Sequence, residues 1–273
     1  MSDGAGAHAP GTRRMGRVSD EEGQLSYSSY LKVPELLDLQ VLTSSPPAHD
    51  ELLFIVVHQA YELWFKEVLF ELEAIRDLMF RGEVTKARHF LSRVHSIERL
   101  MKEQIEVLET MDPQDFLEFR SNLEPASGFQ SVQFREIEFL SGLQDRRYLG
   151  LARTPDERGR LERRLAEPTL WMAFCAALEA NGLPMPLDDE AARESSLTKL
   201  ARDRDAFANL WYLADDLLVH DELFMLWRQR HVLMVERQIG SKTGTGGSSG
   251  ASYLRSTLEK RFYPELWDIR SHL

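Results

Sequence analysis

Residues 51–81 carry apolar side chains at helical spacing, and Gly82 ends the run. The first half of this segment, LLFIVVHQAYELWF, is apolar on most faces, which predicts a deeply buried helix. The same period recurs along most of the chain, and we find no convincing alternation of a half-buried strand. Long helices of this kind must pack against one another, so we expect an all-α fold, a helical bundle with long central helices.

The other expected helices follow the same period and end at proline, glycine or capping residues. They span residues 85–111, 114–120, 132–143, 168–181, 195–217 and 221–239. Asp50 is the expected N-cap of the helix at 51–81. Residues 144–166 are charged and weakly patterned, and we expect them to be exposed. Residues 1–24, rich in Gly, Ala, Ser and Arg, predict a disordered tail, which leaves 25–273 as a single domain.

The charge balance and the single cysteine narrow the class of protein. A net charge of -11 disfavours binding to a nucleic-acid backbone. No apolar run reaches the length that spans a bilayer, and no export signal precedes the domain. Cys175 has no second cysteine for a disulfide, and a CxxCH heme-attachment motif does not occur, so any heme must be non-covalent. We therefore expect a cytoplasmic protein without nucleic-acid or membrane partners.

Two histidines stand out because each lies in a strongly apolar helical run. A buried helical histidine such as His58 or His231 can ligate a metal or a heme iron. Taken singly, each is more often a hydrogen-bonded core histidine. His58 and Glu62, one turn apart, can present two ligands or form a buried polar contact. The HExxH, Walker and nucleophile-elbow motifs do not occur.

Three further features suit a small polar ligand. Arg120 precedes a Ser/Gly loop and can bind a carboxylate in bidentate fashion or form a structural ion pair. The glycine- and hydroxyl-rich residues 240–250 follow the helix of His231 and can cover a ligand as a lid. Tyr27 and Tyr30 form either an aromatic pocket wall or an apolar helix edge.

Four blocks in order between residues 25 and 270 carry a resemblance to a known family. They are LSYSSYLKVPELL, DELLFIVVHQAYELWFKE, FRSNLEPASGFQSVQFREIE, and LWRQRHVLMVERQIG followed by GTGGSSG and FYPELWDIR. These blocks resemble the tryptophan 2,3-dioxygenases. The resemblance implies a non-covalent heme b held between helices, with O₂ as co-substrate. It also implies cleavage of the indole C2–C3 bond of L-tryptophan to N-formylkynurenine, the first step of kynurenine-type degradation.

The resemblance assigns roles to particular residues. His231 matches the proximal ligand of the heme iron, and Ser127 and Gly128 match the loop beside the heme. His58 matches the catalytic-site histidine that hydrogen-bonds the indole N–H, and Phe54 matches an aromatic residue that packs on the indole.

The remaining implied residues bind the amino-acid end of the substrate or complete its pocket. Arg120 matches the partner of the substrate carboxylate, and Thr245 contacts the ammonium and carboxylate groups. Leu123, with Phe54, Tyr27 and Leu31, is expected to line the apolar slot of the substrate pocket. Tyr27, Tyr30 and Leu31 match an N-terminal segment exchanged toward a neighbouring subunit, in a homotetramer built as a dimer of dimers.

This chain departs from the family pattern near the lid and the heme. Residues 240–243 read Gly-Ser-Lys-Thr where the family usually has Gly-Phe-Lys-Arg. Ala60 replaces a usual Thr or Ser, Met225 a common Gln, and Phe116 is a known variant of a tyrosine position. The alternative is a specialised paralogue that acts on a substituted tryptophan or inserts one oxygen atom to leave an oxindole. A third hypothesis is a heme-binding or heme-sensing helical protein without turnover. Such a protein would not need the residues His58, Arg120 and Thr245 that are expected to hold an amino acid.

Overall fold

The computed structural model describes residues 25–246 and 250–272, so the expected disordered tail lies outside the described residues. The chain divides into two compact units, Met1–Val41 and Leu42–Leu273. In the first unit, α1 (Tyr27–Leu31) and α2 (Val33–Leu37) bury no residue. The single domain expected over 25–273 stays a prediction.

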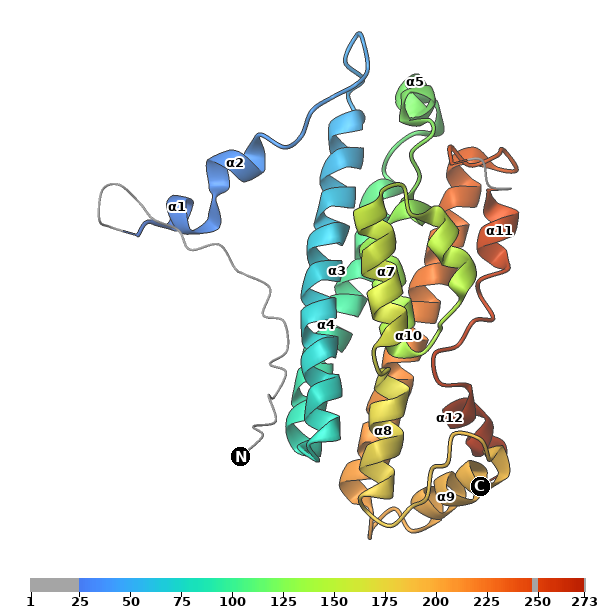
Figure 1. Ribbon diagram of the computed structural model, residues 1–273. Coiled ribbons are helices and arrows are strands. Elements are labelled where there is room, and N and C mark those ends of the chain that lie inside the picture. Colours follow the sequence, from blue (N-terminus) through green and yellow to red (C-terminus); the bar gives the residue numbers. More distant parts are fainter. Residues whose placement is uncertain (1–24, 247–249, 273) are drawn as a thin grey trace. The chain divides into compact units, whose positions relative to one another are not determined.

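The second unit confirms the all-α class, since every regular element described in it is helical. Three long helices, α3 (Glu51–Phe80), α4 (Val84–Leu108) and α10 (Ala208–Ile239), run alongside one another, and α4 packs against both others (Figure 1). The shorter α-helices are α5 (Pro113–Arg120), α6 (Val132–Ser141), α7 (Pro155–Ala166), α8 (Leu170–Glu179), α9 (Glu190–Arg202), α11 (Ala251–Arg255) and α12 (Pro264–Asp268). The 3₁₀ helices are η1 (Ser121–Leu123), η2 (Gly128–Gln130), η3 (Arg146–Leu151) and η4 (Ile269–His272).

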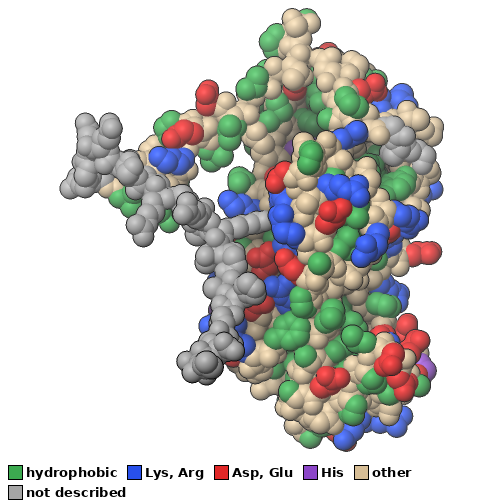
Figure 2. Space-filling view, in the orientation of Figure 1, with side chains coloured by type: hydrophobic (Ala, Val, Ile, Leu, Met, Phe, Trp, Pro, Cys, Tyr) green, Lys and Arg blue, Asp and Glu red, His purple; other side chains and the backbone are tan. Residues whose placement is uncertain are grey.

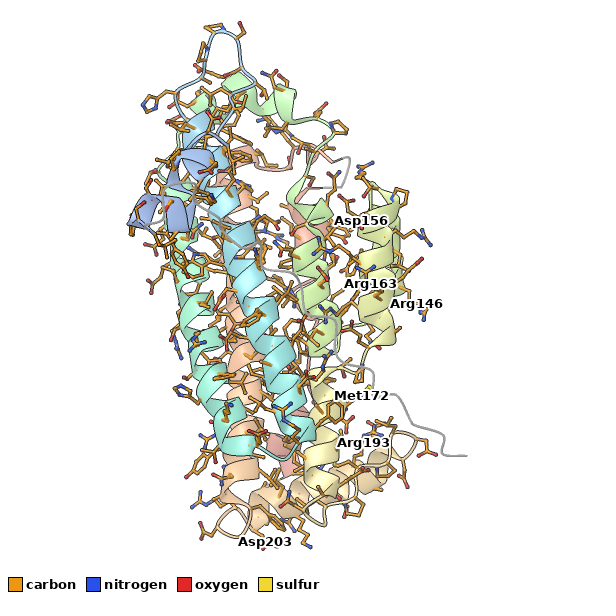
Figure 3. The ribbon with its side chains drawn as sticks, turned by 60° about the vertical axis from the view of Figure 1, so that its left-hand side comes forward. Arg146, Asp156, Arg163, Met172, Arg193 and Asp203 are labelled. Atoms are coloured by element: carbon orange, nitrogen blue, oxygen red, sulfur yellow. The ribbon has the colours of Figure 1, made fainter. Side chains whose placement is uncertain are left out.

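The segment 144–166, which was expected to be exposed, contains η3 and α7. Thr154 and Glu157 form a capping box at the start of α7, and Leu161 and Arg164 are buried on its inner face. Asp156 and Arg163 lie on the outer surface of α7 (Figure 3). The expectation of exposure was wrong for the inner face, where the charge of Arg164 is paired with glutamates rather than solvated.

The break predicted between residues 217 and 221 does not exist, because α10 runs continuously through it. Asp221 is buried and acts in tertiary structure rather than as a helix cap. Its Oδ2 accepts hydrogen bonds from the backbone N–H groups of Phe262 and Tyr263 and from Trp267 Nε1, at 3.0–3.1 Å. The FYPELWDIR block is thereby anchored to α10. The real interruption lies at 203–207, between α9 and α10.

The start of α3 uses a different residue from the one expected. Asp50 occupies the N-cap position, but its side chain makes no capping hydrogen bond. The Glu51 carboxylate instead accepts hydrogen bonds from both the backbone and the hydroxyl groups of Thr43 and Ser44. Burial opposes ionisation of Glu51, but these bonds outweigh it and lower its pKa to about 2. The loop at 43–50 is thus fixed against the end of α3 that carries Phe54 and His58.

The visible surface of the molecule is mixed in charge. Acidic and basic side chains are interspersed over the helices seen in Figure 2. Across the described ranges, no helix is long and apolar enough to cross a membrane. The cytoplasmic location stays a prediction.

Candidate functional site

A cavity of about 280 Å³ opens among the helices of the second unit. Its wall combines side chains of α3, α4, α5, α6 and α10 with the Ser/Gly loop at 127–131 and the lid residues 244–245. The predicted site residues that line it are Phe54, His58, Arg120, Ser127, Gly128, His231 and Thr245. Residues far apart in the sequence therefore meet at one cavity, as the resemblance implied.

His58 and Phe54 lie one turn apart on α3, with ring centroids 4.0 Å apart. The His58 Nδ1 lies 2.7 Å from the Phe54 carbonyl oxygen, and because a carbonyl can only accept, Nδ1 carries the proton. Burial lowers the pKa of His58, so the ring is neutral at pH 7. Its Nε2 then holds a free lone pair and can accept a hydrogen bond.

His231 faces the cavity from α10 and is stacked on Trp227, one turn earlier, with centroids 5.2 Å apart and planes 9° apart. Burial, and repulsion from His58 whenever that ring is protonated, lower the pKa of His231 to about 4. Within the described residues, neither ring nitrogen has a hydrogen-bond partner. Histidine ligates metals through a neutral imidazole nitrogen, and His231 has both the neutral ring and an available nitrogen.

Glu62 is not part of a protein-only metal site. Its backbone carbonyl and its Oε2 both accept hydrogen bonds from Gln133 Nε2, each at 2.8 Å. No group of three or more candidate ligands occurs in the part of the chain that the structure describes. His58 and Glu62 therefore have separate hydrogen-bond partners, the Phe54 carbonyl and Gln133, and the choice between the two alternatives stays a prediction.

The lid contacts the cavity wall through one main-chain carbonyl and one side-chain hydroxyl. The Arg120 guanidinium donates to the carbonyl oxygen of Thr243, and the Thr245 hydroxyl donates to the carbonyl of Ala126 at 2.7 Å. Gly250 has a positive φ of 63°, and a Cβ there would lie 2.4 Å from the carbonyl oxygen of Lys242. The lid contacts of 242 and 243 are thus made by main-chain atoms, which the unusual side chains at 241–243 leave intact.

Two sets of predicted residues lie elsewhere. Leu123 packs against the apolar cluster of Met111, Phe116, Phe119 and Ile239, next to the cavity wall. Tyr27, Tyr30 and Leu31 belong to the other unit, where they are exposed. Their roles at a substrate pocket stay predictions.

Sequence reasoning missed a group of charged residues on the cavity wall. Arg135 and Glu138 on α6 and Arg228 on α10 are all at most 4% exposed, and all three line the cavity. Gln238 also lines it, with a buried Oε1 that has no hydrogen-bond partner among the described residues. The available signal was the placement of charged residues inside the apolar helical run QFREIEFL, where a charge must find a partner.

The fold and the cavity define an all-α protein whose cavity is lined by apolar side chains, buried arginines and two imidazoles. Comparison with known proteins gives the particular family. The family model described as tryptophan 2,3-dioxygenase matches residues 13–168 and 177–273. The chain belongs to the tryptophan 2,3-dioxygenase family, which confirms the resemblance.

Individual relatives match over nearly their whole length. A tryptophan 2,3-dioxygenase of a Nocardioides species is 57% identical over 260 residues, covering 93% of this chain and 97% of the relative. That of Herpetosiphon aurantiacus is 45% identical, covering 91% and 98%. That of Myxococcus xanthus is 40% identical, covering 94% and 93%. The similarity therefore spans both units of the chain.

Proposed function

We propose that this chain is a heme-dependent dioxygenase that cleaves the indole C2–C3 bond of L-tryptophan with O₂ to give N-formylkynurenine. The observation that carries the proposal is the pair of neutral histidines, His58 and His231, that α3 and α10 bring to one cavity. Family membership supports the same activity, and it does not favour the alternative of a paralogue that inserts one oxygen atom.

The residues of the cavity fit a non-covalent heme b. The imidazole of His231 is neutral at pH 7, so one of its ring nitrogens can offer a lone pair to iron. The Ser127–Gly128 loop borders the same space, and the buried guanidinium groups of Arg135 and Arg228 suit the anionic periphery of the cofactor. When bound, the heme supplies the iron chemistry that activates O₂. His231 would hold that iron.

His58 has the protonation state needed to orient the substrate. Because Nδ1 donates to the Phe54 carbonyl, Nε2 is left to accept the N–H of an indole. The Phe54 ring, 4.0 Å from His58 between centroids, offers an apolar surface to the same indole. The two residues together fix both the position and the rotation of the ring to be cleaved.

The amino-acid end of the substrate would meet Arg120 and Thr245. Arg120 uses part of its donor set on the Thr243 carbonyl and keeps further N–H groups for a carboxylate. The Thr245 hydroxyl donates to Ala126, so its oxygen remains available to accept from an ammonium group. Arg120 would therefore contact both the main chain of Thr243 and the substrate carboxylate.

We also propose that the chain acts as a homotetramer, with Tyr27, Tyr30 and Leu31 of α1 reaching the pocket of a neighbouring subunit. These three side chains are 78%, 63% and 45% exposed, which favours burial against another chain. On α3, Leu52, Val56, Leu63 and Phe70 are also exposed at helical spacing. Such a stripe is typical of a surface that packs on another helix.

The direct test is product analysis. Ferrous, heme-loaded protein is incubated with L-tryptophan and ¹⁸O₂, and the product is identified by mass. We expect N-formylkynurenine with both labelled atoms. A product with one added oxygen atom, or no turnover by protein with a full complement of heme, would overturn the proposal.

A further inference from the structure

Glu138 bridges two buried arginines on the cavity wall. Its Oε1 accepts a hydrogen bond from Arg228 Nη2 at 2.7 Å, and its Oε2 accepts one from Arg135 Nη1 at 2.5 Å. The three residues come from α6 and α10 and are 1%, 3% and 4% exposed, in the order Glu138, Arg228, Arg135. We refer to Arg135 and Arg228 as the arginine pair.

Aromatic rings enclose the arginine pair. The Arg135 guanidinium lies 4.0 Å from the ring centroid of Tyr148, and that of Arg228 lies 4.9 Å from the centroid of Phe224. Arg228 Nη1 also donates to the Lys260 carbonyl at 2.8 Å. These contacts fix both side chains and keep water from them.

The charges of this cluster do not cancel. Among the described residues, Glu138 is the carboxylate that pairs with each member of the arginine pair. Two guanidinium groups and one carboxylate leave one positive charge beside the cavity. A buried charge without a partner is costly, so a cavity with this wall favours an anionic ligand.

We propose that Glu138 is a positioning residue that sets the charge of the cavity wall, and through it the reduction potential of the heme. The inference rests on the proposed function and goes beyond it. Glu138 holds the arginine pair against the cavity and cancels one of its two charges. Ferrous heme carries one negative charge more than ferric heme, so each positive charge added to the wall stabilises the ferrous form more.

The first test is Glu138→Gln, which keeps the side-chain shape and removes the negative charge. We expect the Fe(III)/Fe(II) midpoint potential, measured by spectroelectrochemistry, to shift upward. The matched control is Glu136→Gln on the same helix. Glu136 is also buried and also pairs with two arginines, Arg160 and Arg164, but it does not line the cavity among the described residues. Its replacement should leave the potential unchanged.

The second test is Arg228→Gln, which removes one positive charge and should shift the potential downward. The double variant Glu138→Gln, Arg228→Gln restores the net charge, and its potential should return toward the wild-type value. Loss of packing alone would not give shifts of opposite sign that cancel. If Glu138→Gln takes up no heme, Arg228→Gln alone carries the test.

Each result separates this inference from the proposed function. Equal shifts in Glu138→Gln and Glu136→Gln, or an unchanged or raised potential in Arg228→Gln, would overturn the role of Glu138 while the wild-type protein still binds heme. Wild-type protein that leaves the Soret band of added hemin unshifted would overturn the proposed function itself.

Discussion

Helix α10 places two histidines in opposite surroundings. His231 faces the cavity, and within the described residues its ring nitrogens have no hydrogen-bond partners. His220, three turns earlier, is fully buried, and both of its nitrogens are bonded: Nδ1 to Glu98 at 2.6 Å and Nε2 to Ser141 at 2.9 Å. We call Glu98, Ser141 and His220 the sealed cluster.

The sealed cluster shows that hydrogen-bond geometry does not by itself make a reactive site. Serine, histidine and carboxylate stand in the order of a hydrolase triad. All three are at most 1% exposed, and none of them lines the cavity. A substrate has no access to Ser141, so the cluster serves to join α4, α6 and α10. His231, by contrast, has no hydrogen-bond partner within the described residues, so its ring nitrogens are available to a ligand in the cavity.

The largest expected effect comes from exchanging each histidine for alanine. His231→Ala should fold but purify without heme, since it removes the iron ligand, and its activity should be lost. His220→Ala should still bind heme in its folded fraction. The measurement is the Soret absorbance per protein chain after titration with hemin. A wild-type Soret band in His231→Ala would show that the proximal ligand lies elsewhere.

The second effect concerns stability, for which His220→Ala should be more damaging than His231→Ala. His220→Ala leaves a cavity and removes the partner of both Glu98 and Ser141, so the free energy of unfolding should fall by about 2–4 kcal/mol. In heme-free protein, His231→Ala removes no hydrogen bond and loses only the stacking on Trp227, so it should cost about 1 kcal/mol. Urea denaturation of the two heme-free variants measures the difference. Equal losses would mean that the sealed cluster contributes no more than the cavity wall.

Much of this fold follows from sequence periodicity. The helices at 51–81 and 85–111 were predicted close to their observed ends, because each buries an uninterrupted apolar stripe and meets a glycine or a proline segment. Two predictions, a helix break at 217–221 and exposure of the segment 144–166, were wrong for the same reason. Asp221 and Arg164 are buried charges whose partners come from distant elements, and local sequence does not show those partners.

The same limit applies to the site. Apolar surroundings singled out His58 and His231, yet His220 lies in an equally helical run, LADDLLVHDEL, and serves structure. What separates His220 from His231 is the presence of Glu98 and Ser141, 122 and 79 residues away. The ligand role of His231 followed from the family resemblance, and residue chemistry alone does not distinguish it from His220.

The third effect concerns the second cavity histidine. His58→Ala should keep heme, because His231 is untouched, and should lower kcat/KM for L-tryptophan by about 10- to 100-fold, the value of one buried hydrogen bond to the indole N–H. For 1-methyl-L-tryptophan, which lacks that N–H, wild type and His58→Ala should differ much less. A loss of the same size with both substrates would place His58 outside hydrogen-bond contact with the indole.

The smallest effect is the acid sensitivity of the core beside the sealed cluster. Burial, with the nearby charge of His220, lowers the pKa of His95 to about 4, while its Nε2 lies 2.9 Å from the Asp216 carbonyl. The unfolded chain, with a histidine pKa of about 6.5, then binds more protons than the folded chain between about pH 4 and 6.5. The stabilisation from a neutral His95 is therefore present above about pH 6.5 and is lost as the pH falls toward 4.

His95→Gln should flatten the plot of unfolding free energy against pH in this window, and the change in slope should correspond to less than about one proton. The control is Ser92→Ala, an exposed and non-titrating change on the same helix, which should leave the slope as in the wild type. An unchanged slope in His95→Gln would locate the acid sensitivity elsewhere, and the cavity histidines would then be the first place to look.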